Sequence, residues 1–142
     1  MRKIAVLLVG VFMVACSSQK GQKNSEHLLY EVLLESDQDG GEFQFYEILT
    51  EAKEIKMLLS DPVLRKKIDE DDIKVSNFVI LNMGEKPSGG YSIGIDTVIE
   101  EADKIVIKVK ESKPAAGEMT TSVMTYPYAV VKINSKKKIE IK

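Results

Sequence analysis

The chain has few of the side chains that most often carry chemistry. Its 142 residues include one cysteine, one histidine and no tryptophan. A histidine-based triad or dyad needs its histidine beside a nucleophile, and the single histidine, His27, precedes the first apolar segment as an ordinary polar residue. Zinc is bound mainly by cysteine and histidine, so the chain has almost no set of zinc ligands. We therefore expect no enzymatic activity, no metal and no cofactor.

The acidic residues form no recognisable site either. Asp37 and Asp39 stand at the first and third positions of a calcium loop, but Glu42 takes the sixth, where an EF-hand needs glycine. We interpret residues 37–41 as a hairpin turn and the acidic run at residues 69–72 as a solvated connection. No pair of carboxylates stands out in an apolar setting of the kind that hydrolysis requires.

The charge balance argues against nucleic acid as a partner. The chain has 20 basic and 22 acidic residues, and no basic face is interleaved with aromatic residues. The lysines at residues 136–138 are expected in an exposed hairpin turn, with contact to an anionic membrane surface as the alternative.

The chain begins with the pattern of a secretory signal peptide. Arg2 and Lys3 give a basic start, residues 4–14 are uncharged and apolar, and a small residue, Ala15, follows. At about 1.5 Å per helical residue, this run covers only about half of the ~30 Å hydrocarbon core of a bilayer. It is too short for a permanent span, so residues 1–15 are predicted to be a signal peptide.

Cys16 stands at the expected cleavage site and has no second cysteine with which to form an internal disulfide. Residues 13–16, Met-Val-Ala-Cys, resemble the lipobox of bacterial lipoproteins, with Met13 where leucine is usual. The resemblance implies a diacylglycerol on the Cys16 sulfur, cleavage before Cys16 and acylation of the new amino group. An unused cysteine or an intermolecular disulfide is the alternative.

Lipidation at Cys16 would make the mature chain a membrane-anchored protein. Two or more acyl chains anchor a protein stably without spanning the bilayer. Residues 16–26 are polar and are predicted to be a flexible tether. Ser17 carries no evident inner-membrane retention signal, so we expect an exported protein at the outer membrane or cell surface. Without the signal peptide, 18 basic and 22 acidic residues remain, a net charge of about −4.

Residues 27–142 are long enough for a single folded domain with its own core. The patterns predict an α+β fold, a mainly antiparallel β-sheet with one amphipathic helix packed on one face. The helix is expected over residues 47–59, where apolar residues recur at spacings of three and four. Residues 27–36 are expected to form a first strand, and residues 43–46 a short strand that pairs back on it.

The rest of the chain after the acidic run reads as β structure. Strands are predicted over residues 73–83, 91–97, 105–109, 119–125, 128–133 and 139–141. Apolar residues alternate with lysines over residues 104–110, as in a sheet with one wet face.

Residues 85–95, EKPSGGYSIGI, place a proline and two glycines directly before an alternating strand. Pro87 sets φ for a turn, and Gly89 or Gly90 supplies the positive φ that a bulge requires. A phosphate-binding loop would lead into a helix, whereas this stretch leads into a strand. These features favour a hairpin connection, and Tyr91 beside the rigid turn keeps partner contact open as the alternative.

Two longer stretches and the lipobox together resemble the PrcB family. They are MGEKPSGGYSIGI at residues 83–95 and IVIKVKESKPAAGEMTTSVMTYPYAVVKI at residues 105–133. The family's carboxy-terminal domain has a Gly-Gly-Tyr turn, a proline-containing loop and a Pro-Tyr before the closing strand. The corresponding positions here are Gly84, Pro87, Gly89, Gly90, Tyr91, Pro114, Pro127 and Tyr128. Ser88 stands where threonine is common. The resemblance covers residues 73–133.

The resemblance implies a non-catalytic lipoprotein that binds, stabilises and anchors a surface protease complex. The family's founding member is an accessory subunit of the dentilisin complex, beside a subtilisin-like protease and a companion subunit. The expected contact residues are those of three loops that we expect to gather at one end of the sheet. They are Pro87, Ser88, Gly89, Gly90, Tyr91, Pro114, Gly117, Tyr126, Pro127 and Tyr128.

Two other functions remain open at this point. A protease inhibitor or modulator would insert the glycine-rich loop at residues 87–91 into an active-site cleft. An envelope ligand-binding module would have no link to a protease.

Overall fold

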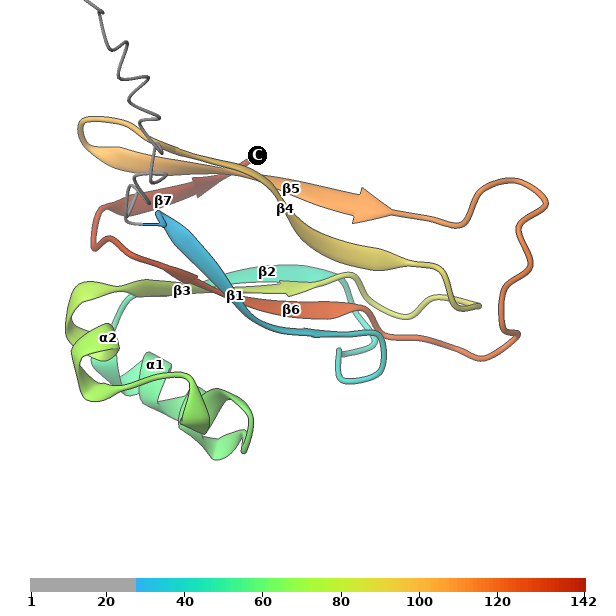
Figure 1. The fold of residues 1–142 in the computed structure, drawn as a ribbon, viewed down its shortest axis with the longest axis horizontal. Coiled ribbons are helices and arrows are strands. Elements are labelled where there is room, and N and C mark those ends of the chain that lie inside the picture. The colour runs from blue at the N-terminus through green and yellow to red at the C-terminus, as the bar shows by residue number, and fades with distance from the viewer. Residues whose placement is uncertain (1–27) are drawn as a thin grey trace, which may run out of the picture.

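Residues 28–142, described by a computed structural model, form two β-sheets and a helical layer stacked on one another (Figure 1). The four-stranded sheet is antiparallel, with the strand order β1-β6-β3-β2. Its strands are β1 (Tyr30–Ser36), β2 (Phe45–Leu49), β3 (Asn77–Asn82) and β6 (Tyr128–Ile133). The signal peptide, Cys16, the tether and His27 lie outside the described residues.

The three-stranded sheet and the helical layer cover opposite faces of the four-stranded sheet (Figure 1). The smaller sheet contains β4 (Ser92–Glu100), β5 (Lys104–Ser112) and β7 (Lys138–Ile141). β4 and β5 are antiparallel, whereas β5 and β7 are parallel. The helical layer contains α1 (Ala52–Met57), η1 (Leu58–Ser60), η2 (Leu64–Lys66) and α2 (Glu70–Val75).

The central strands β3 and β6 bury side chains on both of their faces. Val79 and Val131 pack against the three-stranded sheet, whereas Phe78 and Val130 pack against the helical layer, and all four are fully buried. A strand covered on both sides has no wet face, so its sequence is a continuous apolar run rather than an alternation. On β5, by contrast, Ile107 is fully buried and its neighbour Lys108 is exposed, which confirms the predicted wet face.

The α+β class and the mainly antiparallel pairing are confirmed, but the predicted helix over residues 47–59 is not. Residues 47–49 belong to β2, where Ile48 pairs with Val79 of β3. The helix begins only after Glu51, which forms a capping box with Glu54, and its last turn tightens into η1. The apolar residues therefore keep a spacing of three and four over a segment that forms a strand, because pairing with β3 outweighs the local preference for a helix.

The acidic run also differs from its expectation as a solvated connection. Asp69 caps α2, and its Oδ1 accepts a 2.8 Å hydrogen bond from the backbone N–H of Asp72. Asp72 returns the interaction by accepting from the N–H of Asp69, which completes a capping box. The strand predicted from residue 73 therefore begins at Asn77 instead, and Ile73 packs into the core from α2.

Three connections predicted as hairpin turns join strands that are not neighbours. Residues 37–41 lead from β1 to β2, which are separated in the sheet by β6 and β3. Residues 84–91 and 134–137 each carry the chain from one sheet to the other. The tight hairpin within residues 28–142 joins β4 to β5. The positions of the turns were predicted correctly. Which strands pair on either side of them was not, because strand pairing depends on the burial of both faces of β3 and β6.

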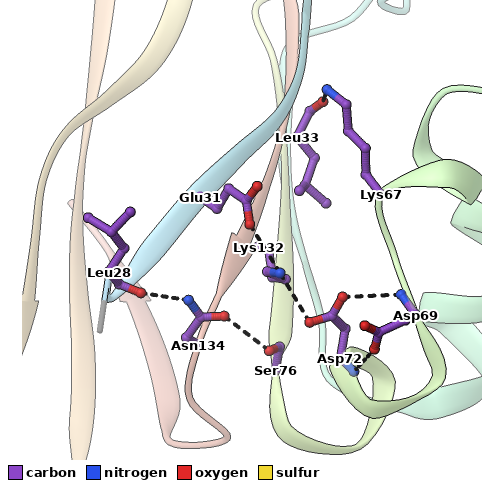
Figure 2. A network of polar contacts seen from close by, with 9 residues as sticks. All are labelled: Leu28, Glu31, Leu33, Lys67, Asp69, Asp72, Ser76, Lys132 and Asn134. Carbon is purple, nitrogen blue, oxygen red and sulfur yellow. Dashed lines mark hydrogen bonds and ion pairs between the residues drawn. The ribbon is translucent and has the colours of Figure 1, made fainter. Parts of the chain in front are cut away.

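Lys132 ties β1, β6 and α2 together (Figure 2). Its Nζ lies 3.1 Å from a Glu31 oxygen and 3.0 Å from Asp72 Oδ1, and the lysine side chain is only 12% exposed. Burial alone lowers the pKa of Lys132, but the hydrogen bonds to Asp72 and Glu31 outweigh it and hold the pKa above its usual value. The ion pairs therefore keep this side chain charged inside the structure.

Candidate partner-binding surface

Two loops that are far apart in the sequence run side by side at one end of the molecule (Figure 1). Residues 84–91 connect β3 to β4, and residues 113–127 connect β5 to β6. Lys86 and Thr125 form an isolated antiparallel bridge with N···O distances of 2.8 and 2.9 Å. Thr125 is buried, and its hydroxyl donates to the Ser88 carbonyl at 2.8 Å. This pairing fixes the two loops relative to each other.

The two adjacent glycines are required by the close approach of these loops. Gly89 donates its N–H to the Thr121 carbonyl at 3.1 Å. Gly90 has a φ of 86°, and a Cβ there would lie 2.9 Å from Pro114 Cγ. Since L-residues rarely adopt this φ and the space is already filled, glycine is the residue that fits. The positive φ predicted for Gly89 or Gly90 is therefore found at Gly90.

Tyr126 connects a third loop, residues 37–44, to the same end. Its backbone N–H donates to the Asp37 carbonyl at 2.7 Å, and its carbonyl accepts from Gly40 at 3.0 Å. Its hydroxyl donates to a Glu85 carboxylate oxygen at 3.0 Å, and this hydrogen bond raises the pKa of Tyr126. We call residues 37–44, 84–91 and 113–127 together the loop end.

The side chain of Asn82 holds residues 41–43 of the loop end by hydrogen bonds, and the sequence analysis did not identify it. The side chain is fully buried at the last position of β3. Its Oδ1 accepts from the Gly41 N–H at 2.9 Å, and its Nδ2 donates to the carbonyls of Gly41 and Phe43. A polar residue ending an apolar strand was the available signal, because a buried amide needs partners.

The structure brings part of the predicted contact set together, and its contact with a partner stays a prediction. Ser88, Gly89 and Gly90 face residues of the 113–127 loop, Pro114 among them. Gly117, with a φ of 79°, stands apart, because nothing lies within 4 Å of a Cβ built there. Pro127 is buried, and its carbonyl accepts from the Met83 N–H at 2.9 Å, so its place is structural.

Two of the three tyrosines of the predicted set, Tyr91 and Tyr128, lie where the loops meet the strands β4 and β6. Tyr91 is half-buried against the core between the sheets, and Lys86 Nζ lies 6.0 Å from its ring centroid. Tyr128 is half-buried against the helical layer, where burial raises its pKa. Both line an open cleft of about 580 Å³ between β1 and β4.

Large apolar side chains are exposed on the loop end. Met119 is 99% exposed, Val123 58% and Met124 49%, all within residues predicted as a strand. That prediction is wrong, because residues 119–124 pair with no strand and only Thr125 forms a bridge. Phe43, on the neighbouring loop, is 81% exposed. These four exposed apolar side chains make the loop end a candidate interaction surface.

The loop end lies away from the point where the described chain begins (Figure 1). β1 runs from Tyr30 toward the loop end over seven residues. At about 3.3 Å per residue, the strand separates the two ends by ~23 Å. Within residues 28–142, no helix has the length and apolar character needed to cross a bilayer, and no three potential metal-binding side chains cluster.

Residues 77–134 match the model of the PrcB C-terminal family, which confirms the resemblance over that segment. The match runs from the start of β3 to the residue after β6 and includes two of the three loops of the loop end. It covers less than half of the 142 residues.

The chain is also similar to an uncharacterized protein of Methanocaldococcus jannaschii. The two are 34% identical over 64 residues, 45% of this chain and 38% of the relative. The alignment thus spans less than two thirds of the relative's length. No solved structure matches the chain.

Proposed function

We propose that this protein is a non-catalytic, lipid-anchored accessory subunit that binds and stabilises a surface subtilisin-like protease complex. The observation that carries the proposal is the match of residues 77–134 to the PrcB C-terminal family, because the resemblance implies a protease-associated role. The same segment holds residues 113–127, the loop on which Met119, Val123 and Met124 are exposed. Lipidation at Cys16 and a place at the outer membrane or cell surface are part of the proposal.

The arrangement of the described residues supports contact through the loop end. An anchor on the predicted flexible tether would join the chain near the beginning of β1, at the opposite end from the loop end, and would leave the loop end free for a partner (Figure 1). A partner standing on the same membrane would meet Met119, Val123 and Phe43, side chains that lose contact with water on binding. Backbone bridges hold the loops beneath them, so little ordering entropy is lost.

The test is copurification with the protease from native membranes. The double variant Met119→Lys/Val123→Lys places two charges on the loop end. Its matched control is Met57→Lys/Val75→Lys, which changes the same residue types at positions 71% and 60% exposed on the helical layer. We expect the loop-end variant to lose the protease and the control to retain it, with equal melting temperatures. Retention by both variants would contradict the proposal.

The two alternative functions give different results in the same material. A scaffolding subunit lengthens the lifetime of the protease and leaves its turnover number unchanged. An inhibitor acting through residues 87–91 lowers the turnover number when added in excess. An envelope ligand-binding module recovers no protease from the membrane at all. The pairing of Ser88 and Gly89 with the neighbouring loop holds residues 87–91 in place under either function, so the turnover number is the measurement that separates scaffolding from inhibition.

A further inference from the structure

The two sheets leave an open cleft on the side where each has an edge strand. β1 is an edge of the four-stranded sheet, and β4 is an edge of the three-stranded sheet. The cleft between them has a volume of about 580 Å³, within the range of ligand-binding sites. Its lining includes five consecutive residues, Tyr91 to Ile95, so it runs along the first half of β4. The space is therefore elongated in the direction of a strand.

The backbone of β4 is open to pairing along this cleft. Residues 92–95 pair with β5 in regular register, and the register shifts only after Ile95. In an antiparallel pair, alternate residues of an edge strand point their N–H and C=O groups away from the partner strand. Such an edge is a template for an added strand. Bulges protect edges from this pairing, but the irregularity of β4 lies beyond the cleft residues.

The charges in the cleft indicate what kind of strand it takes. Glu35 and Asp37 line it from β1 and the following turn, and Lys110 lines it from β5. The eight ion pairs among residues 28–142 include neither carboxylate. A Glu35 oxygen lies 3.5 Å from the position of a Cβ at Gly94, so this carboxylate reaches across to β4. A basic side chain on a bound strand would pair with it.

We propose that the cleft binds an extended peptide segment of a partner protein, which pairs with β4 and places a basic side chain against Glu35 and Asp37. Tyr30, Val32 and Ile95 provide apolar contacts for the alternate side chains of the peptide. Gly94 leaves room for the peptide, since no backbone atom lies within 4 Å of a Cβ built there. The inference does not depend on the protease, because the peptide pairs with β4; the cleft shares only Asp37 and Tyr91 with the loop end.

The test measures fluorescence anisotropy of labelled peptides with the purified full chain in detergent. The probe is acetyl-Thr-Val-Lys-Val-Lys-Val-Thr-amide. One comparison peptide replaces both lysines by glutamate, and a second replaces the central valine by proline, which cannot complete a backbone ladder. We expect saturable binding of the lysine peptide with a Kd below about 1 mM. The glutamate and proline peptides should each bind at least about tenfold more weakly.

Two variants locate the binding in the cleft. Gly94→Leu projects a side chain into the cleft and should abolish binding, whereas Thr97→Leu, on an exposed position of the same strand, should not change it. Glu35→Gln combined with Asp37→Asn should weaken binding of the lysine peptide by about tenfold. Binding of the glutamate peptide should stay the same or become tighter. Equal circular dichroism spectra and melting temperatures establish that the variants are folded.

Several results would overturn the proposal. They are no saturation by the lysine peptide at 1 mM, equal binding of the proline peptide, or undiminished binding to folded Gly94→Leu protein. A dimer that dissociates on Gly94→Leu substitution, with no peptide binding, would assign the cleft to a second copy of this chain. Because the assay contains no protease, its outcome leaves the copurification result unaffected.

Discussion

At Gly90 the backbone has a φ of 86°, and the neighbouring loop lies against the missing side chain. Gly117 has a similar φ of 79°, but nothing lies within 4 Å of a Cβ there. The two positions therefore separate backbone strain from steric contact within one protein. Strain acts at both positions, whereas contact with Pro114 acts only at Gly90.

We predict that Gly90→Ala lowers the free energy of unfolding by about 2–3 kcal/mol and Gly117→Ala by about 1 kcal/mol. The difference arises because a Cβ at Gly90 lies 2.9 Å from Pro114 Cγ, and the proline must move. Urea denaturation of the purified proteins measures both changes. Equal losses would show that the two loops separate easily and that their contact adds nothing to stability.

Lys132 and Lys74 offer a similar comparison of ion pairs. We predict that Lys132→Met destabilises the protein by about 1.5–3 kcal/mol, because it leaves the half-buried Asp72 without its partner. Lys74→Met removes a pair whose side chains are 68% and 87% exposed, and should cost less than about 0.5 kcal/mol. Urea denaturation at neutral pH measures both. Similar losses of stability for the two variants would contradict the conclusion that the ion pairs of Lys132 stabilise the fold.

The pH dependence of this difference follows from the raised pKa of Lys132. A raised lysine pKa stabilises the folded state fully below the unfolded value of 10.5, and the contribution is lost as the pH rises through the folded value. The stability gap between the wild type and Lys132→Met should therefore be constant up to about pH 10 and shrink above 10.5. A gap that vanished between pH 7 and 9 would assign the effect to another group.

At the scale of elements, α2 shows how a short polar segment becomes a helix. Asp69 and Asp72 satisfy each other's backbone N–H groups, and Ile73 carries the helix onto the core. The pattern was visible in the sequence as an aspartate three residues before another acidic residue. Whether these residues form a helix depends on the packing of Ile73 against the four-stranded sheet, because a helix of six residues is not stable alone.

We predict that Asp69→Ala destabilises the protein by about 1 kcal/mol, because the first turn of α2 loses its cap. Asp69→Ser keeps a side-chain acceptor at the cap and should cost less than about 0.5 kcal/mol. Thermal and urea denaturation of the two variants test the comparison. A serine variant as unstable as the alanine variant would mean that Asp69 acts through its charge rather than as a cap.

The connections were predicted less well than the strands they join. Residues 128–133 and 139–141 were expected as strands, and β6 and β7 are found there. The glycine, proline and aspartate clusters were recognised as turns, since these residues provide turn geometry locally. Whether a turn closes a hairpin or crosses between sheets depends on which strands are neighbours, and the local residues do not contain that information.

At the scale of the whole molecule, the stacking of layers separates three surfaces. The four-stranded sheet lies in the middle, so the helical layer and the three-stranded sheet cannot contact each other's inner face. The long connections collect at the loop end, while the edges of β1 and β4 border the cleft. A partner at the loop end and a peptide in the cleft would therefore contact adjoining parts of the protein, with Asp37 and Tyr91 common to both.

The sequence by itself determined the β-rich class, the turn residues and the tight loop at Gly89 and Gly90. These follow from local backbone geometry and from the alternation of apolar and polar residues. It also carried the resemblance of the later strands and loops to the PrcB family. Only the tertiary structure decided that residues 47–49 are a strand, that the sheets are two, and that Asn82 holds the loop end. Each of these depends on contacts between residues distant in the chain, where burial outweighs local preference.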